Sequence, residues 1–377
     1  MIEDIKHFRV NWVDGMKISK DHFHGLQNYA QDIVKDTTSI SLKKDDYGLL
    51  SSYLMQSHEY SVNIDVHKNI NISIQRLRGI APNGARIEIS SKTLNVEHNI
   101  PFNDVVDNKI DEGYIMITLN PNQNTSFGEQ NLEEVPPRSP FLNNSFLFSF
   151  IDIKNIENSD VSPYQLPIAK IKKENDLWEV NENYIAPCLT VSADPRLIDF
   201  YIYTDTFLKK MERSSVKIVQ KVVNEENKNP IADIISIIAS NLLNFLGTQI
   251  VQLTSEKHHN KPKNLINIIR SMARVMKNHI DTSSPENKEM LLNYFGEWTD
   301  LSGGDYENLF AKTINLKYQH FDINLSLEIV TNFMFTLDKL FTILTEIDYI
   351  GKKKDSGIFV NENIVKSDDN APTFLTD

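Results

Sequence analysis

The sequence predicts an α+β protein in which an N-terminal antiparallel β-sandwich precedes an α-helical bundle. From about residue 50 to residue 190, apolar side chains recur at every second position, which is the period of a strand with one buried face. From Asp194 onward they recur with the helical period of 3.6 residues. We therefore expect a β-rich domain over residues 1–192, a helical domain over residues 193–351 and a polar tail over residues 352–377.

Short strands joined by Asn, Pro and Gly turns make up the β-rich domain, as in a sandwich or barrel. The expected strands are Tyr60–Val66, Ile70–Ile74, Ala85–Ile89, Gly113–Leu119 and Phe146–Phe150. The fourth is almost continuously apolar, which indicates a more deeply buried strand. Pro82-Asn83-Gly84 predicts a hairpin, because Asn and Gly tolerate the positive φ of a tight turn. The polar segment from Pro121 to Pro140 predicts a long loop.

Three helices of the second domain begin with the same signature, a side chain that can accept a hydrogen bond followed by a proline. These starts are Asp194-Pro195, Asn229-Pro230 and Ser284-Pro285. The clearest helical stripe lies nearer the C-terminus and has the alternating three- and four-residue spacing of a heptad seam. It consists of Leu327, Val330, Met334, Leu337, Phe341 and Leu344. We expect Gly351 to end this helix, because glycine readily adopts the left-handed conformation there.

The composition is that of an ordinary water-soluble protein. The 377 residues carry a net charge of −12, which argues against nucleic-acid binding, because a phosphate-binding surface needs clustered Lys and Arg. The single Cys188 fits a reducing compartment, and Met1 to Val10 lack the apolar run of a signal peptide. Polar residues recur through the apolar run Ile231–Leu253, so we expect an amphipathic helix without membrane insertion. These features predict a cytoplasmic protein.

No motif predicts a catalytic, cofactor-binding or metal site. His22-Phe23-His24 could form a metal site, but neighbouring side chains on a helix point about 100° apart, and neither Cys nor a carboxylate ladder lies nearby. His258-His259 lies in a polar segment that favours a solvated loop, and Cys188 lies in an apolar context that favours the core. The sequence contains neither a glycine-rich phosphate loop nor a Gly-x-Ser-x-Gly motif. We therefore expect no enzyme.

The most specific motif of the chain lies within its first two dozen residues, where Trp12-Val13-Asp14-Gly15-Met16 is followed by His22-Phe23. It resembles the opening of the TssK family, the baseplate subunits of bacterial type VI secretion systems, in which a Trp-x-x-Gly-Met core precedes His-Phe. Further segments resemble the same family, in family order. They are Leu166–Ile171, Tyr184–Leu189, Ala193–Leu197, Leu291–Glu297 and Tyr318–Asp322.

The resemblance implies a β-rich shoulder, a helical neck, a homotrimer, and attachment of the shoulder to the TssF and TssG wedge of the baseplate. The family usually carries a compact C-terminal head that docks on the membrane complex, whereas only Lys352 to Asp377 follow Gly351 here. The resemblance is therefore to a shortened form, which would contact the membrane complex indirectly or through its tail. It would lie at the inner face of the cell envelope.

Two groups of residues are candidates for interfaces. The first is Trp12, Gly15, Met16, His22 and Phe23. Its aromatic and Met side chains either belong to the core of the β-rich domain or form an apolar surface at a subunit or partner boundary, where such residues are enriched. The second is the heptad seam from Leu327 to Leu344, which Phe333, Leu340 and Ile347 widen beyond the needs of a single neighbour. It is the candidate for neck and trimer packing.

The sequence thus predicts a structural baseplate subunit, a trimeric connector between the wedge and the envelope complex. The alternative is a phage-tail-like receptor-binding or adhesion protein. Such a protein would share the shoulder, the neck and the trimer, but it normally needs a carbohydrate-binding head.

Overall fold

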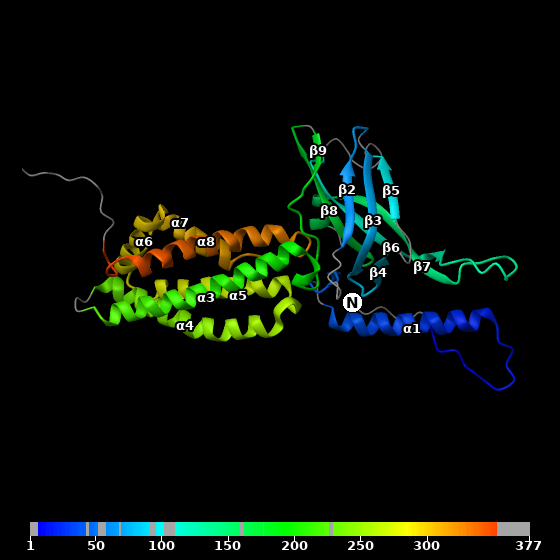
Figure 1. Ribbon diagram of the computed structural model, residues 1–377, viewed down its shortest axis with the longest axis horizontal. Helices are drawn as coiled ribbons and strands as arrows, with labels where there is room; N and C mark the ends of the chain where they lie inside the picture. The colour runs from blue at the N-terminus through cyan, green and yellow to red at the C-terminus, as the bar shows by residue number, and fades with distance from the viewer. Residues whose placement is uncertain are drawn as a thin grey trace, which may run out of the picture.

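A computed structural model shows a sandwich of strands followed by a bundle of helices, which confirms the α+β class (Figure 1). It describes residues 7–42, 45–51, 58–67, 69–90, 96–101, 110–158, 162–175, 177–225 and 229–352. We call the strand-rich part the shoulder and the helical bundle the neck. Of the predicted tail, only Lys352 lies within the described residues.

The shoulder contains two antiparallel sheets. The first comprises β1 (Gly48–Leu49), β2 (Glu59–Ile64), β3 (Asn69–Ile80), β4 (Arg86–Ile89) and β5 (Val96–Pro101). The first half of β3 pairs with β2 and β5, and its second half pairs with β1 and β4. The second sheet has the order β7-β6-β8-β9, with β6 (Glu112–Phe127), β7 (Phe141–Asp152), β8 (Gln165–Glu174) and β9 (Leu177–Val180). A short helix, α2 (Ile153–Asn158), contacts β6 and β7.

The alternating side chains supply the shoulder core, as their period predicts. Ile70, Ile72 and Ile74 of β3 are buried. Strand β6 is buried at every position from Tyr114 to Ile117, which agrees with its continuous apolar run. The predicted hairpin is present, because Gly84 has a φ of +85° and its N–H donates to the Ala81 carbonyl at 2.8 Å. The five predicted strands are therefore present as β2, β3, β4, β6 and β7, whereas β1, β5, β8 and β9 were not predicted.

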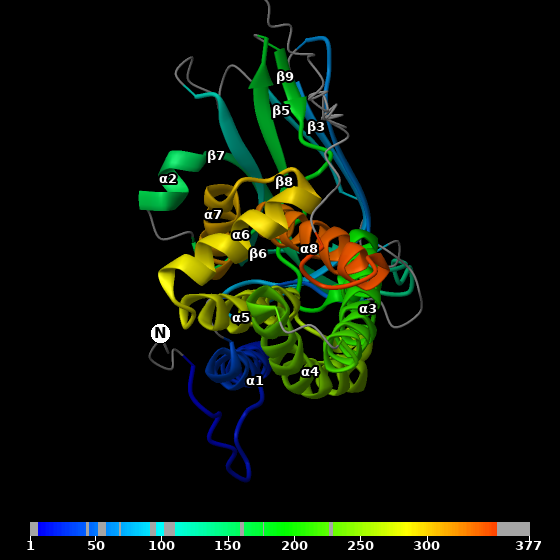
Figure 2. The same ribbon diagram turned by 90° about the vertical axis from the view of Figure 1, so that its left-hand side faces the viewer.

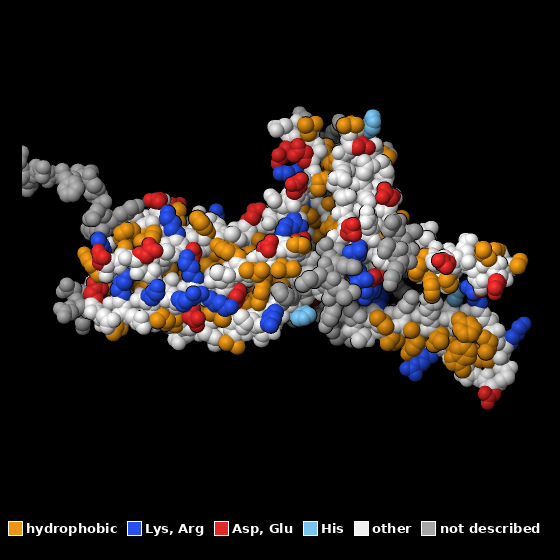
Figure 3. Space-filling model, viewed as in Figure 1, with side chains coloured by type: hydrophobic (Ala, Val, Ile, Leu, Met, Phe, Trp, Pro, Cys, Tyr) orange, Lys and Arg blue, Asp and Glu red, His pale blue; other side chains and the backbone are white. Residues whose placement is uncertain are grey.

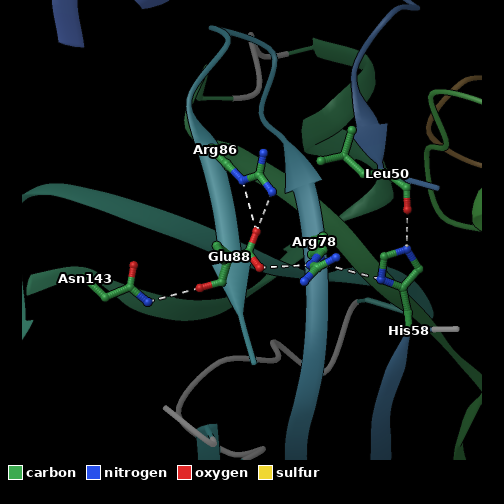
Figure 4. A network of polar contacts seen from close by, with 6 residues as sticks. All are labelled: Leu50, His58, Arg78, Arg86, Glu88 and Asn143. Atoms are coloured by element: carbon green, nitrogen blue, oxygen red, sulfur yellow. Dashed lines mark hydrogen bonds and ion pairs between the residues drawn. The ribbon is translucent and has the colours of Figure 1, made fainter. Parts of the chain in front are cut away.

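A polar network connects β3 and β4 to the second sheet (Figure 4). Arg78 Nε and Arg86 Nη2 donate to the Glu88 carboxylate at 2.9 and 2.7 Å. Asn143 of β7 donates to the Glu88 carbonyl at 3.0 Å. His58 Nε2 donates to the Leu50 carbonyl at 2.9 Å, and His58 Nδ1 accepts from the Arg78 N–H. A ring that donates through one nitrogen and accepts through the other is neutral.

The neck contains α3 (Pro195–Val223), α4 (Pro230–Glu256), α5 (Pro262–Asp281), α6 (Pro285–Thr299), α7 (Gly303–Ile314) and α8 (Ile323–Glu346). Its three predicted helix starts are confirmed, because the side chains of Asp194, Asn229 and Ser284 each accept a backbone N–H of the following turn. The start of α5 was not predicted, since Lys261 before it has no capping oxygen.

Helix α8 lies among four other helices of the neck and contacts α3, α5, α6 and α7 (Figure 2). Its six seam residues, Leu327, Val330, Met334, Leu337, Phe341 and Leu344, are all buried within the single chain. The breadth of the apolar face therefore reflects several intrachain neighbours. It supplies no argument for a neighbouring copy, contrary to the inference from the sequence.

Two predicted boundaries are wrong. Helix α8 ends at Glu346, and Gly351 lies in the turn beyond it, where its N–H donates to the Tyr294 hydroxyl at 3.0 Å. The segment from Pro121 to Pro140 is not a loop throughout, because β6 continues to Phe127 across an irregularity between Asn120 and Asn124. Backbone pairing with β7 needs no apolar side chains, so this extension of the hairpin has no alternating pattern.

Helix α4 has the length and apolar composition of a membrane span, and 28% of its most apolar window is buried. It packs along α3 and α5, and its buried residues include Ile235, Leu242 and Leu246. The structure thus gives α4 a place in the bundle of the neck.

Candidate partner interface on the N-terminal arm

Residues 7–41 form an arm that projects from the shoulder and consists of an extended segment followed by helix α1 (Lys20–Ser41) (Figure 1). This helix was not predicted. Within the described part of the chain, α1 has no extensive contact with any other helix or strand. Isolated helices are marginally stable in water, so an amphipathic helix of this kind is typical of a surface that a partner covers.

The TssK-like motif builds the tip of the arm. Met16 N–H donates to the Val13 carbonyl at 3.1 Å and closes a turn in which Gly15 has a φ of +80°, a conformation that favours glycine. Ser19 and His22 then cap α1 reciprocally, because His22 Nδ1 accepts from the Ser19 N–H at 3.0 Å. His22 therefore contributes to the cap at the start of the helix.

Polar contacts hold the extended segment against α1 and the base of α1 against the shoulder. His7 Nδ1 lies 2.9 Å from the Asp32 carboxylate, and Arg9 Nε donates to the Tyr29 hydroxyl at 2.8 Å. At the base, Lys35 Nζ donates to the hydroxyl of Tyr164, next to β8, at 3.1 Å. These contacts leave the apolar side chains of the arm uncovered.

Trp12 lies at the centre of the tip, with its ring centroid 5.9 Å from that of His22 and 6.4 Å from that of Phe23. The structure thus brings together the five residues that the sequence singled out. Trp12 is 46% exposed, Phe23 is 58% exposed, and Met16 is half-buried. The interpretation of these residues as core of the shoulder is wrong, because they lie on the arm and away from both sheets. Their role as an interface stays a prediction.

The exposed surface extends beyond the predicted residues, and hydrophobic side chains gather along the arm (Figure 3). The additional exposed residues are Phe8, Val13, Ile18, Leu26, Ile33 and Val34. Phe23, Leu26, Ala30 and Ile33 follow one another at intervals of three or four residues on α1. This helical period was the signal in the sequence that could have revealed the stripe.

A second apolar projection is the hairpin formed by the ends of β6 and β7. Phe127 and Phe141 pack with ring centroids 5.5 Å apart, and Phe141, Leu142 and Val135 are exposed. In Figure 1 this hairpin and the arm both point away from the neck. The end of the shoulder opposite the neck therefore carries two exposed apolar elements.

The exposed side chains that gather on the arm are mainly apolar and aromatic. Among the described residues, no three His, Cys, Asp or Glu side chains converge on a point that could hold a metal. Cys188 is buried in the shoulder core, and burial raises the pKa of its thiol well above the ordinary value. A buried neutral thiol is a poor nucleophile.

Comparison with known proteins identifies the fold. No family model matches the sequence, and no curated protein matches it significantly. A crystal structure of TssK matches with a TM-score of 0.51 and 13% identity, over 89% of this chain and 72% of that chain. The baseplate complex from the type VI secretion system matches with a TM-score of 0.54 and 15% identity, over 89% of this chain and 99% of that chain. This chain thus has the fold of TssK.

Proposed function

We propose that this protein is a structural subunit of the baseplate of a contractile type VI secretion apparatus, and that its arm binds the TssF and TssG wedge. One observation carries the proposal. A chain with the TssK fold exposes its TssK-like motif, Trp12 to Phe23, at the tip of an arm that its own shoulder does not cover. A motif that only stabilised the shoulder would lie in the shoulder core.

The composition of the arm supports a protein partner. Aromatic side chains and Met dominate the energetics of interface cores, and Trp12, Met16 and Phe23 combine both kinds. The stripe of Phe23, Leu26, Ala30 and Ile33 has the spacing with which an amphipathic helix enters an apolar groove. The wedge would therefore supply an apolar groove for α1 and a pocket for Trp12.

The proposal includes a homotrimer at the cytoplasmic face of the envelope, which helps to link the baseplate to the membrane complex. Because the seam of α8 is covered within one chain, the copies would meet through other surfaces of the shoulder and neck. Light scattering of the purified protein should report three times the chain mass of 43.3 kDa. A monomer at micromolar concentration would contradict the proposed homotrimer, but it would not contradict the proposal that the arm binds the wedge.

The decisive test is co-purification of the wedge proteins with a Trp12→Ala/Phe23→Ala variant. Each aromatic anchor contributes about 2 kcal/mol or more at an interface, so the loss of both should lower the affinity for the wedge by about 1,000-fold. A matched control is Phe335→Ala/Tyr349→Ala, which removes two exposed aromatic side chains from the neck and should retain the wedge proteins.

Wild-type recovery of the wedge with a folded Trp12→Ala/Phe23→Ala protein would reject the arm as the binding surface. If the purified chain bound a glycan and no wedge protein, the receptor-binding alternative would be favoured instead.

A further inference from the structure

The shoulder and the neck meet at a junction built from three chain segments, residues 45–49, 181–194 and 318–323. Leu49 N–H donates to the Pro187 carbonyl at 2.7 Å, and Leu189 N–H donates to the Leu49 carbonyl at 3.0 Å. The backbone approaches so closely that a Cβ on Gly48 would lie 2.2 Å from the Pro187 oxygen. Ile323 N–H, at the start of α8, donates to the Ile185 carbonyl at 3.3 Å.

An ion triad with two buried members, Lys170 and Asp322, and a partly exposed Glu112 crosses this junction. Lys170 of β8 points its Nζ at the Asp322 carboxylate, 2.9 Å away, and at the Glu112 carboxylate of β6, 2.7 Å away. The side chains of Lys170 and Asp322 are each only 4% exposed. Asp322 immediately precedes α8, so the triad connects two strands of the shoulder to the central helix of the neck.

Lys170 remains charged in the folded protein. Burial alone lowers the pKa of Lys170, but the hydrogen bonds from its ammonium to Glu112 and Asp322 outweigh burial, and the pKa is raised. The Tyr114 ring lies 5.6 Å from Nζ and adds a cation–π contact. Two carboxyl groups surround one ammonium, and Asp322 Oδ1 has no hydrogen-bond partner among the described residues.

A buried arrangement of this kind contributes little net stability, because desolvation of the charges offsets their attraction. Its distinctive property is geometric. Apolar surfaces can slide past one another at small cost, whereas a buried ammonium displaced from its carboxylates leaves unpaired charges. The ion pair between Asp322 and Lys170 can therefore form only within a narrow range of angles between α8 and the sheet that contains β8.

We propose that Lys170, Glu112 and Asp322 form a latch that fixes the angle between shoulder and neck. With the latch closed, a displacement imposed on the shoulder moves the far end of the neck as part of the same rigid body. Without it, the neck swings about the backbone contacts of residues 45–49 and 185–189. The latch acts on the joint whatever partner the shoulder binds.

The test measures the distance between spin labels on the two domains. Val66, at the end of the β2–β3 hairpin, and Val223, at the end of α3, are 93% and 73% exposed and would be replaced by labelled cysteines. The native Cys188 is buried and escapes labelling. Lys170→Met should widen or shift the distribution of label distances measured by pulsed dipolar spectroscopy, relative to the otherwise unchanged labelled protein.

Lys172→Met is the matched control, because Lys172 lies on the same strand and pairs with Glu174 at the surface. It should leave the distribution unchanged. If Lys170→Met does not fold, Lys170→Met/Asp322→Leu removes both buried charges, while the partly exposed Glu112 can turn toward water. A folded variant of either kind with the wild-type distribution would overturn the latch and reduce the triad to a packing feature.

Discussion

Helices α1 and α8 are amphipathic helices of similar length, 22 and 24 residues. The apolar stripe of α8 is buried, whereas that of α1 is exposed. On α8, Leu337 and its neighbours in the seam are completely buried by other helices of the same chain. On α1, Phe23, Leu26 and Ile33 face outward. Equivalent periodicity in the sequence therefore serves the core of the protein in one place and an external surface in the other.

The difference teaches where the stability of each helix comes from. Most helical stability in proteins comes from packing of the apolar face and not from local propensity. Helix α8 obtains that packing from the neck, whereas α1 depends on its caps and on polar contacts to the preceding segment. Binding of a partner to α1 would then stabilise the arm as well as form the interface.

The largest expected effect is the difference between a Leu→Asp substitution on α8 and the same substitution on α1. Leu337→Asp buries an unpaired carboxylate among apolar side chains and should lower the free energy of unfolding by about 4 kcal/mol or more, with loss of soluble protein. Leu26→Asp places the same group on an exposed site and should change the free energy of unfolding by less than about 1 kcal/mol. Urea unfolding measures both, and equal losses would break the distinction between covered and uncovered helices.

A second expectation concerns two histidines in the covered parts of the molecule, of which His320 is buried and His58 is partly buried. Burial lowers the pKa of His58 and of His320, against the opposing effect of their hydrogen bonds to the Leu50 and Tyr47 carbonyls. Because the pKa is lower in the folded state, the unfolded chain binds more protons between the two values. The contribution of the two histidines to the free energy of unfolding is therefore complete above their pKa in the unfolded chain, about 6.5. It is lost as the pH falls from that value toward the lower pKa of the folded state.

Urea midpoints at pH 7.5 and pH 5.5 check this expectation, with the lower midpoint at pH 5.5. The double variant His58→Gln/His320→Gln should lose most of the difference. His24→Gln, on the exposed arm, should keep it. A midpoint that did not change between the two pH values would show that neither ring is held neutral.

The smallest expected effect comes from a Gly→Ala substitution in a helix of the neck, compared with one in the helix of the arm. Gly247 lies within α4, and a Cβ there would meet nothing within 4 Å, so Gly247→Ala should raise the global unfolding free energy by about 0.5–1 kcal/mol. Gly25→Ala in α1 improves helix propensity equally. Because the arm can open by itself, the gain should appear in hydrogen exchange of α1 and not in global unfolding. A full global gain for Gly25→Ala would show that α1 unfolds with the core.

Much of the fold was predictable wherever local chemistry and burial agree. The alternation of Ile70, Ile72 and Ile74 located β3, and the caps Asp194, Asn229 and Ser284 located three helix starts, because these signals act within a few residues. The TssK-like motif located the tip of the arm. Helix α1 was missed although Phe23, Leu26, Ala30 and Ile33 have the helical period, because the prediction for this region rested on the Trp12 to Phe23 motif and did not extend to the residues after it.

The sequence by itself determined that a strand-rich part precedes a helical part, and it located five strands, three helix starts and the candidate residues Trp12 to Phe23. Only the tertiary structure decided that the seam of α8 is covered within one chain and that Trp12 and Phe23 are exposed. The pairing of Lys170 with Asp322 also joins residues 152 positions apart. Periodicity shows which side of an element is apolar, but what covers that side depends on contacts between distant segments, which local patterns do not encode.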